Sequence, residues 1–128
     1  MVMGAERNFT EAMEAAARIV RPEEKPFSWD LPDEWSKGWW LMQRLEEAGF
    51  GNKVSVKSHV GRMEAGSVEE LVGNMMLFKD MFYKDYSEEE IVKLETAMID
   101  EVPKLEAFHR WDNGVGIKMV AWVGFAWK

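Results

Sequence analysis

The segment that most constrains the fold is the apolar run GIKMVAWVGFAWK, residues 116–128. Both of its alternating faces are apolar, with one formed by Ile117, Met119, Ala121, Val123, Phe125 and Trp127 and the other by Val120, Trp122 and Ala126. A strand that is apolar on both faces is typical of a sheet covered on both sides. We therefore expect residues 116–128 to form a buried strand, which requires other elements on each of its faces.

Length and charge limit the classes of protein that this chain can represent. With 128 residues, 47% of them hydrophobic, the chain is long enough for one domain with a core and too short for two. Acidic residues outnumber basic ones by 23 to 16, and the basic residues are scattered singly. This pattern argues against nucleic acid as a partner. The chain has no cysteine, which excludes disulfides and thiolate chemistry.

The first residues, MVMGAERNFTEAMEAA, do not have the pattern of a signal peptide. No apolar stretch reaches the roughly 20 residues that span a bilayer. We expect a cytoplasmic protein with no membrane partner.

Periodicity predicts four or so helices. Residues 9–20, which Asn8 or Thr10 could cap, have helical spacing, and so do the residues from Pro32 or Asp33 to Ala48, which Gly49 would end. Ser-x-x-Glu capping boxes at Ser67 and Ser87 predict two further helix starts, and Pro103 lies near the end of the second of these helices. Strands are expected at residues 26–31, 52–64 and 116–128, and an Asn-Gly turn at 113–114. The fold class is therefore α+β, with a small mixed sheet of about three strands.

Several phrases resemble class I S-adenosylmethionine-dependent methyltransferases. ARIVRPEEKPFSWD, residues 17–30, resembles the Arg-x-Leu-Lys-Pro-Gly-Gly turn that enters the fifth strand of that family, although Glu23 and Glu24 replace the two glycines. WWLMQRLEEAGFGNKVSVKSH, residues 39–59, is similar to the next helix and the sixth strand. Residues 67–103 and 116–128 look like the helical lid and the seventh strand of the fungal enzymes of secondary metabolism.

The resemblance also implies what is missing. The family binds its methyl donor on a Gly-rich loop in its N-terminal half, and this sequence has no such loop. The resemblance therefore implies a single truncated, Rossmann-like domain over residues 1–128, with a lid-like insertion at 67–103 and no cofactor. Because a strand left at the edge of such a sheet would expose main-chain and apolar groups, we expect a homodimer to complete it.

The resemblance assigns the remaining half to the acceptor substrate. Seven tryptophans and ten methionines suit an adaptable apolar cavity, although they also suit an irregular core. The segments that would line the acceptor pocket carry Trp35, Trp39, Trp40, Met75, Met76, Phe78, Met81, Phe82 and Trp111. The implied function is a cofactor-independent cyclase or isomerase, such as a Diels-Alder pericyclase, that confines a hydrophobic natural-product intermediate. The alternative is a non-catalytic partner or carrier subunit of a biosynthetic enzyme.

Few polar residues could assist such chemistry. Asp30, His59 and Tyr83 are the candidate catalytic residues, since each could accept or donate a proton near the proposed pocket. Two of them also have an ordinary interpretation: Asp30 as a helix cap, and His59, like His109, as a surface or structural residue. Tyr83 is the weakest candidate of the three. Two histidines 50 positions apart, with no cysteine, do not predict a metal site.

Overall fold

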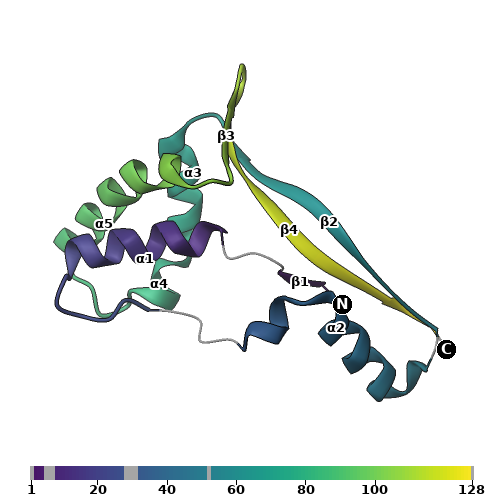
Figure 1. Cartoon of the computed structure of the whole chain (residues 1–128). Coiled ribbons are helices and arrows are strands. Elements are labelled where there is room, and N and C mark those ends of the chain that lie inside the picture. Colours follow the sequence, from purple (N-terminus) through teal and green to yellow (C-terminus); the bar gives the residue numbers. More distant parts are fainter. Residues whose placement is uncertain (1, 5–7, 28–31, 52, 128) are drawn as a thin grey trace. The chain divides into compact units, whose positions relative to one another are not determined.

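A computed structural model describes residues 2–4, 8–27, 32–51 and 53–127 (Figure 1). The strands are β1 (Val2–Gly4), β2 (Val54–Ala65), β3 (Phe108–Trp111) and β4 (Gly114–Ala126). The α-helices are α1 (Asn8–Val20), α2 (Gly38–Leu45), α3 (Val68–Met75), α4 (Lys79–Phe82) and α5 (Glu88–Glu101). Short helical segments of other types are labelled η: the 3-10 helices η1 (Asp33–Ser36), η3 (Met76–Phe78) and η4 (Val102–Lys104), and the π-helix η2 (Glu46–Phe50). The predicted α+β class is confirmed.

The chain divides into two compact units. Unit 1 comprises residues 1–7, 30–61 and 119–128, and unit 2 comprises residues 8–29 and 62–118. The strands β2 and β4 run through both units, and the short strand β1 belongs to unit 1.

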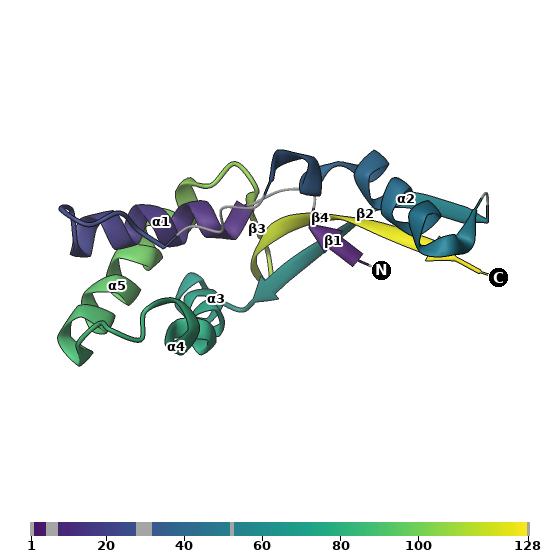
Figure 2. The same cartoon turned by 90° about the horizontal axis from the view of Figure 1, so that it is seen from below.

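Unit 2 is built on the pairing of α1 with α5, which lie side by side in Figures 1 and 2. Small residues one turn apart on α1, including Ala12 and Ala16, are buried and let the two helices approach closely. On α5, Leu94 and Met98 are completely buried. The core of unit 2 also takes in residues of α3 and β4: Val68, Leu71, Val72, Met75, Val115 and Ile117.

Helices begin at both predicted capping boxes, but only the box at Ser87 forms both of its bonds. At Ser67 the Glu70 carboxylate accepts from the Gly66 amide instead, at 3.1 Å. The Ser67 hydroxyl accepts a hydrogen bond from the Glu70 amide at 3.1 Å, and α3 begins at the next residue. Before α5, Ser87 and Glu90 exchange both bonds of the box, at 3.1 and 3.2 Å. These bonds satisfy amides that a helix N-terminus otherwise leaves unpaired.

Unit 1 packs α2 on the sheet around Trp122. The indole Nε1 donates to the Ser36 carbonyl at 2.7 Å, and Gly38 allows the ring to approach, because a β-carbon there would lie 2.9 Å from it. Leu41 and Leu45 are the buried residues of α2, and they pack against Gly124. The expected helix over 33–48 is therefore present but divided into η1, α2 and η2. Gly49 has a φ of 102° and breaks the helical path within η2, near the predicted end.

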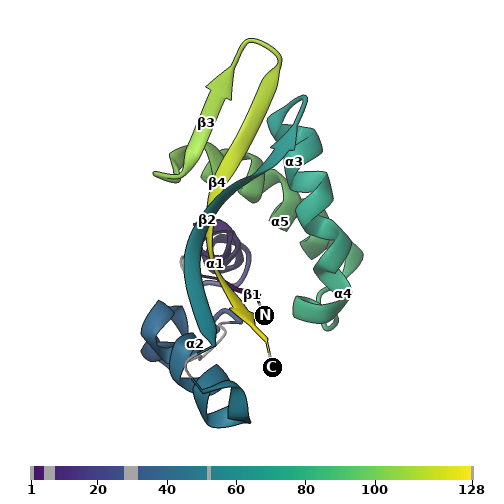
Figure 3. The same ribbon diagram turned by 90° about the vertical axis from the view of Figure 1, so that its right-hand side faces the viewer.

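The sheet has the order β1-β4-β2, and β3 also pairs with β4. β1 and β3 are antiparallel to β4, and Figure 3 shows β2 and β4 running in opposite directions. We expected a mixed sheet, but these pairings are antiparallel. The reason is local: Trp111 pairs with Gly114, so β3 and β4 are joined by a two-residue turn, which only antiparallel strands can accept. The turn is centred on Asp112 and Asn113, one residue earlier than the predicted Asn-Gly.

Two strand predictions need correction. Pro26 and Phe27 lie outside any strand, and the rest of the expected strand at 26–31 lies outside the described residues. β4 is not covered on both faces along its whole length. Val115 and Ile117 are buried, whereas Phe125 keeps 50% of its surface exposed. The helical core of unit 2 covers only the first part of the strand. β1 and β3 were not predicted, since three or four residues are too few to show a period.

The close contact between β2 and β4 predicts opposite effects for two glycine substitutions. In Gly116→Ala the new β-carbon would lie 2.7 Å from the Met63 carbonyl oxygen, so the strands must separate. We expect a loss of about 1–3 kcal/mol in the free energy of unfolding. Gly73→Ala, in α3, meets nothing described within 4 Å beyond its own helix and should gain about 0.5–1 kcal/mol. Urea unfolding of both variants tests these predictions. If Gly116→Ala leaves the free energy of unfolding unchanged, the close packing of β2 on β4 is wrong.

Candidate functional site

A hollow in unit 1 lies where α2 and η2 meet the start of β2 and the end of β4. Its volume is about 590 Å³, and it is lined by Leu45, Phe50, Ser55, Lys57, Gly124, Phe125, Ala126 and Trp127. This volume falls in the range of small-molecule sites, which is roughly 300–1,000 Å³. The hollow is open to solvent along the side of Phe125 and Trp127, which are 50% and 55% exposed.

Local backbone features place the lining residues of this hollow. Phe50 stands between Gly49 and Gly51, whose φ angles of 102° and 58° reverse the chain between η2 and β2. The Trp127 amide donates to the Lys53 carbonyl at 3.3 Å, which ties the end of β4 to the start of β2. Apolar rings from two distant parts of the sequence are thereby brought together where β2 begins and β4 ends.

The polar groups of the hollow are the Ser55 hydroxyl and the Lys57 ammonium. Two residues apart on a strand, they point to the same side of β2. None of the eight lining residues is acidic, although the chain as a whole has a formal charge of −7. The hollow therefore combines apolar surface with a hydrogen-bonding group and a positive charge.

The tryptophans expected to line a pocket belong partly to unit 1. Trp35 and Trp40 contact each other, with ring centroids 5.3 Å apart, and Trp39 is 60% exposed. These three do not line the hollow. His59, an expected catalytic residue, lies exposed on β2. Asp30, the other catalytic candidate in this unit, lies outside the described residues.

The other expected pocket residues belong to unit 2 and serve different roles there. Met75 and Met76 are buried in the core, whereas Phe78 and Met81 are exposed. Trp111 lies on β3 with the Arg62 guanidinium 5.5 Å from its ring centroid. These positions are not gathered around one cavity of unit 2.

Tyr83 is the expected catalytic residue with the most enclosed surroundings. It is 5% exposed, packs against Phe82 and Tyr86, and its hydroxyl donates to the Met13 carbonyl at 3.5 Å. Burial raises the pKa of this hydroxyl above its ordinary value, so it stays protonated at neutral pH. The adjacent hollow, which Phe27 also lines, has a volume of only about 10 Å³ and has no room for a ligand.

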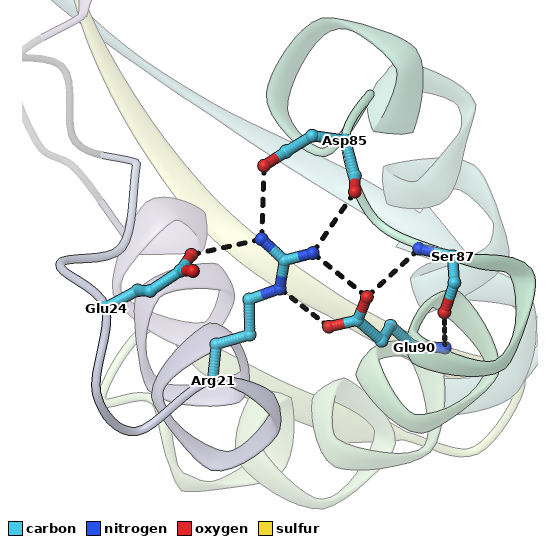
Figure 4. Close-up of polar contacts among 5 residues, drawn as sticks. All are labelled: Arg21, Glu24, Asp85, Ser87 and Glu90. Atoms are coloured by element: carbon cyan, nitrogen blue, oxygen red, sulfur yellow. Dashed lines mark hydrogen bonds and ion pairs between the residues drawn. The ribbon is translucent and has the colours of Figure 1, made fainter.

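The densest polar cluster of unit 2 surrounds Arg21, at the end of α1 (Figure 4). Its guanidinium bonds both oxygens of Glu90, at 2.6 and 2.9 Å, the Glu24 carboxylate at 3.0 Å, and the carboxylate and carbonyl of Asp85 at 3.1 Å each. The Tyr86 ring covers it, with its centroid 4.0 Å from the guanidinium carbon. These five bonds use the five N–H donors of an arginine, so a ligand would have to displace one of them. We interpret the cluster as a structural clamp between α1 and α5.

The clamp shifts the titration of its partners. The Arg21 guanidinium, helped by the Ser87 amide, lowers the pKa of Glu90 to about 2. In return, Glu90 and then Glu24 raise the pKa of Arg21. The sequence indicated the bonds between Ser87 and Glu90, but a single arginine near a turn gave no signal of this long-range contact.

Within the described residues, no group of three or more His, Asp or Glu side chains is arranged to hold a metal ion. In that same part of the chain, no helix has both the length and the apolar character needed to cross a bilayer.

Searches with the sequence found no protein-family model and no curated protein that matches the chain. The resemblance to methyltransferases therefore depends on the quoted sequence motifs alone.

Proposed function

We propose that this chain binds a hydrophobic small molecule in the hollow of unit 1. The observation that supports the proposal is the hollow itself, about 590 Å³ in volume, in which Phe50, Phe125 and Trp127 offer apolar surface. Apolar rings left half exposed are costly to keep in water, and a ligand that covers them recovers part of that cost.

The chemistry proposed for this site is the cyclisation or isomerisation that the sequence resemblance implies. Such a reaction needs a bound conformer and no cofactor, because fixing the reacting atoms close together removes part of the barrier. Confinement requires that the open side be closed. We propose that a second copy of the chain closes it, as the expected homodimer, and covers Phe125 and Trp127.

The alternative is a non-catalytic partner or carrier subunit, and exposed apolar side chains favour it. Trp39 in unit 1 and Leu77 in unit 2 are 60% and 78% exposed, and neither lines the hollow. Surfaces of this kind are common in protein interfaces.

The binding proposal predicts a specific response to pyrenebutanol, a neutral apolar probe whose absorption overlaps tryptophan emission. We expect the probe to quench tryptophan emission in the wild-type chain. Phe125→Ala should weaken binding about tenfold, because a ring that contacts the probe is lost. Phe78→Ala is the matched control, since Phe78 is 56% exposed but lies outside the hollow.

The same samples test the rest of the proposal. Native mass measurement should give a dimer, and S-adenosylmethionine should leave the emission unchanged. Equal binding by all three proteins, or no binding, would overturn the hollow as the site. A monomer that binds the probe would overturn only the closure by a second copy, whereas binding of the methyl donor would contradict the proposal that this chain works without a cofactor.

A further inference from the structure

We propose that the ligand of the unit 1 hollow carries a negative charge, and that Lys57 pairs with it. This inference rests on the proposed function, because it names the chemical class of the ligand for that site. The class is an amphipathic anion with an apolar body and a carboxylate or similar acidic end.

The first observation is that Lys57 has no anionic partner of its own. Arg21, Arg44 and Lys104 each lie within 3.0 Å of a carboxylate, whereas Lys57, like Lys37 and Lys93, forms no ion pair with a described residue. Among the ion pairs of the described residues, none involves Lys57.

The second observation is the charge of the lining. The unit 1 hollow includes Lys57 and no acidic residue. The two other described hollows with room for a ligand carry carboxylates: one of about 300 Å³ is lined by both Glu95 and Lys79, and one of about 450 Å³ is lined by Glu69, Asp112 and Arg110. An anion entering either of these would meet a like charge, whereas in the unit 1 hollow it would meet only the ammonium.

The third observation is the arrangement along β2. Ser55 and Lys57 lie on the same side of the strand, so a hydroxyl donor stands beside the ammonium. A carboxylate accepts from both kinds of donor. The apolar body of the ligand would then lie against Phe50, Phe125 and Trp127.

A matched series of pyrene compounds tests the inference: pyrenebutyrate, pyrenebutanol and pyrenebutylamine, which are anionic, neutral and cationic. We expect the wild-type chain to bind pyrenebutyrate about threefold to tenfold more tightly than pyrenebutanol, and pyrenebutylamine most weakly. Lys57→Gln should remove this preference, so that pyrenebutyrate and pyrenebutanol bind about equally to the variant, and Lys57→Arg should keep it.

The control variant is Lys93→Gln, which removes the same charge from an exposed position on α5 outside the hollow. It should keep the full preference for the anion. Unfolding midpoints that match the wild type show that the variants fold.

The outcomes separate the two proposals. If all three compounds bind equally, or if Lys57→Gln keeps the preference, the inference about Lys57 is wrong while the apolar site stands. Lys57 would then serve only to protect the strand from unwanted pairing. If none of the compounds binds, the proposed function fails and the inference fails with it.

Discussion

Leu94→Ala is expected to reduce the free energy of unfolding by about 2–5 kcal/mol. Leu94 lies in the middle of α5 and has 0% of its surface exposed, in a core shared with α1 and α3. Truncation removes buried methyl groups and leaves a cavity that the neighbouring helices fill only in part. A loss of this size is a large fraction of the stability of a small domain.

The matched control for this prediction is Val92→Ala on the same helix. Val92 is 64% exposed, so its truncation should change the free energy by no more than about 0.5 kcal/mol. Urea unfolding followed by circular dichroism measures both variants. Equal effects at the two positions would mean that α5 does not present this face to the core.

Arg21→Met is expected to destabilise unit 2 and to make its free energy of unfolding less dependent on pH in the acid range. The side chain of Arg21 is only 18% exposed, and its removal leaves the part-buried Glu90 carboxylate with the Ser87 amide but without its two bonds from the guanidinium. Because the pKa of Glu90 is about 2 in the folded chain and 4.5 in the free residue, the ion pair stabilises the fold above about pH 4.5. That stability is lost as the pH falls from 4.5 toward 2. The wild type should therefore lose stability over this range.

The measurement is the urea midpoint at neutral pH and in steps down to about pH 2. Lys104→Met is the control, since Lys104 pairs with Glu101 at 3.0 Å but is 66% exposed. It should have a smaller effect at neutral pH and keep most of the acid dependence. If Arg21→Met retains the full loss of stability between pH 4.5 and 2, the clamp does not cause it.

The hollow shows how much of a site can be predicted from sequence. The sequence predicted the terminal strand, which contains the apolar residues Phe125 and Trp127. It did not predict that these two side chains line a hollow with Phe50. Predicted pocket residues such as Met75 turned out to be core, because apolar side chains of this kind suit either role until their neighbours are known. Lys57 gave no signal, since one lysine among exposed strand residues is ordinary in sequence.

The sequence alone determined the helices α1, α3 and α5 and the strands β2 and β4. Their signals are local: apolar spacing, the Ser67 and Ser87 boxes, and Gly49 near the end of a helix all act over a few residues. The tertiary structure decided which strands pair, how Arg21 joins α1 to α5, and which aromatic residues line the hollow. These depend on contacts between residues as far apart in the sequence as Val2 and Val123, whose energies are set by packing and desolvation and leave no period in the sequence.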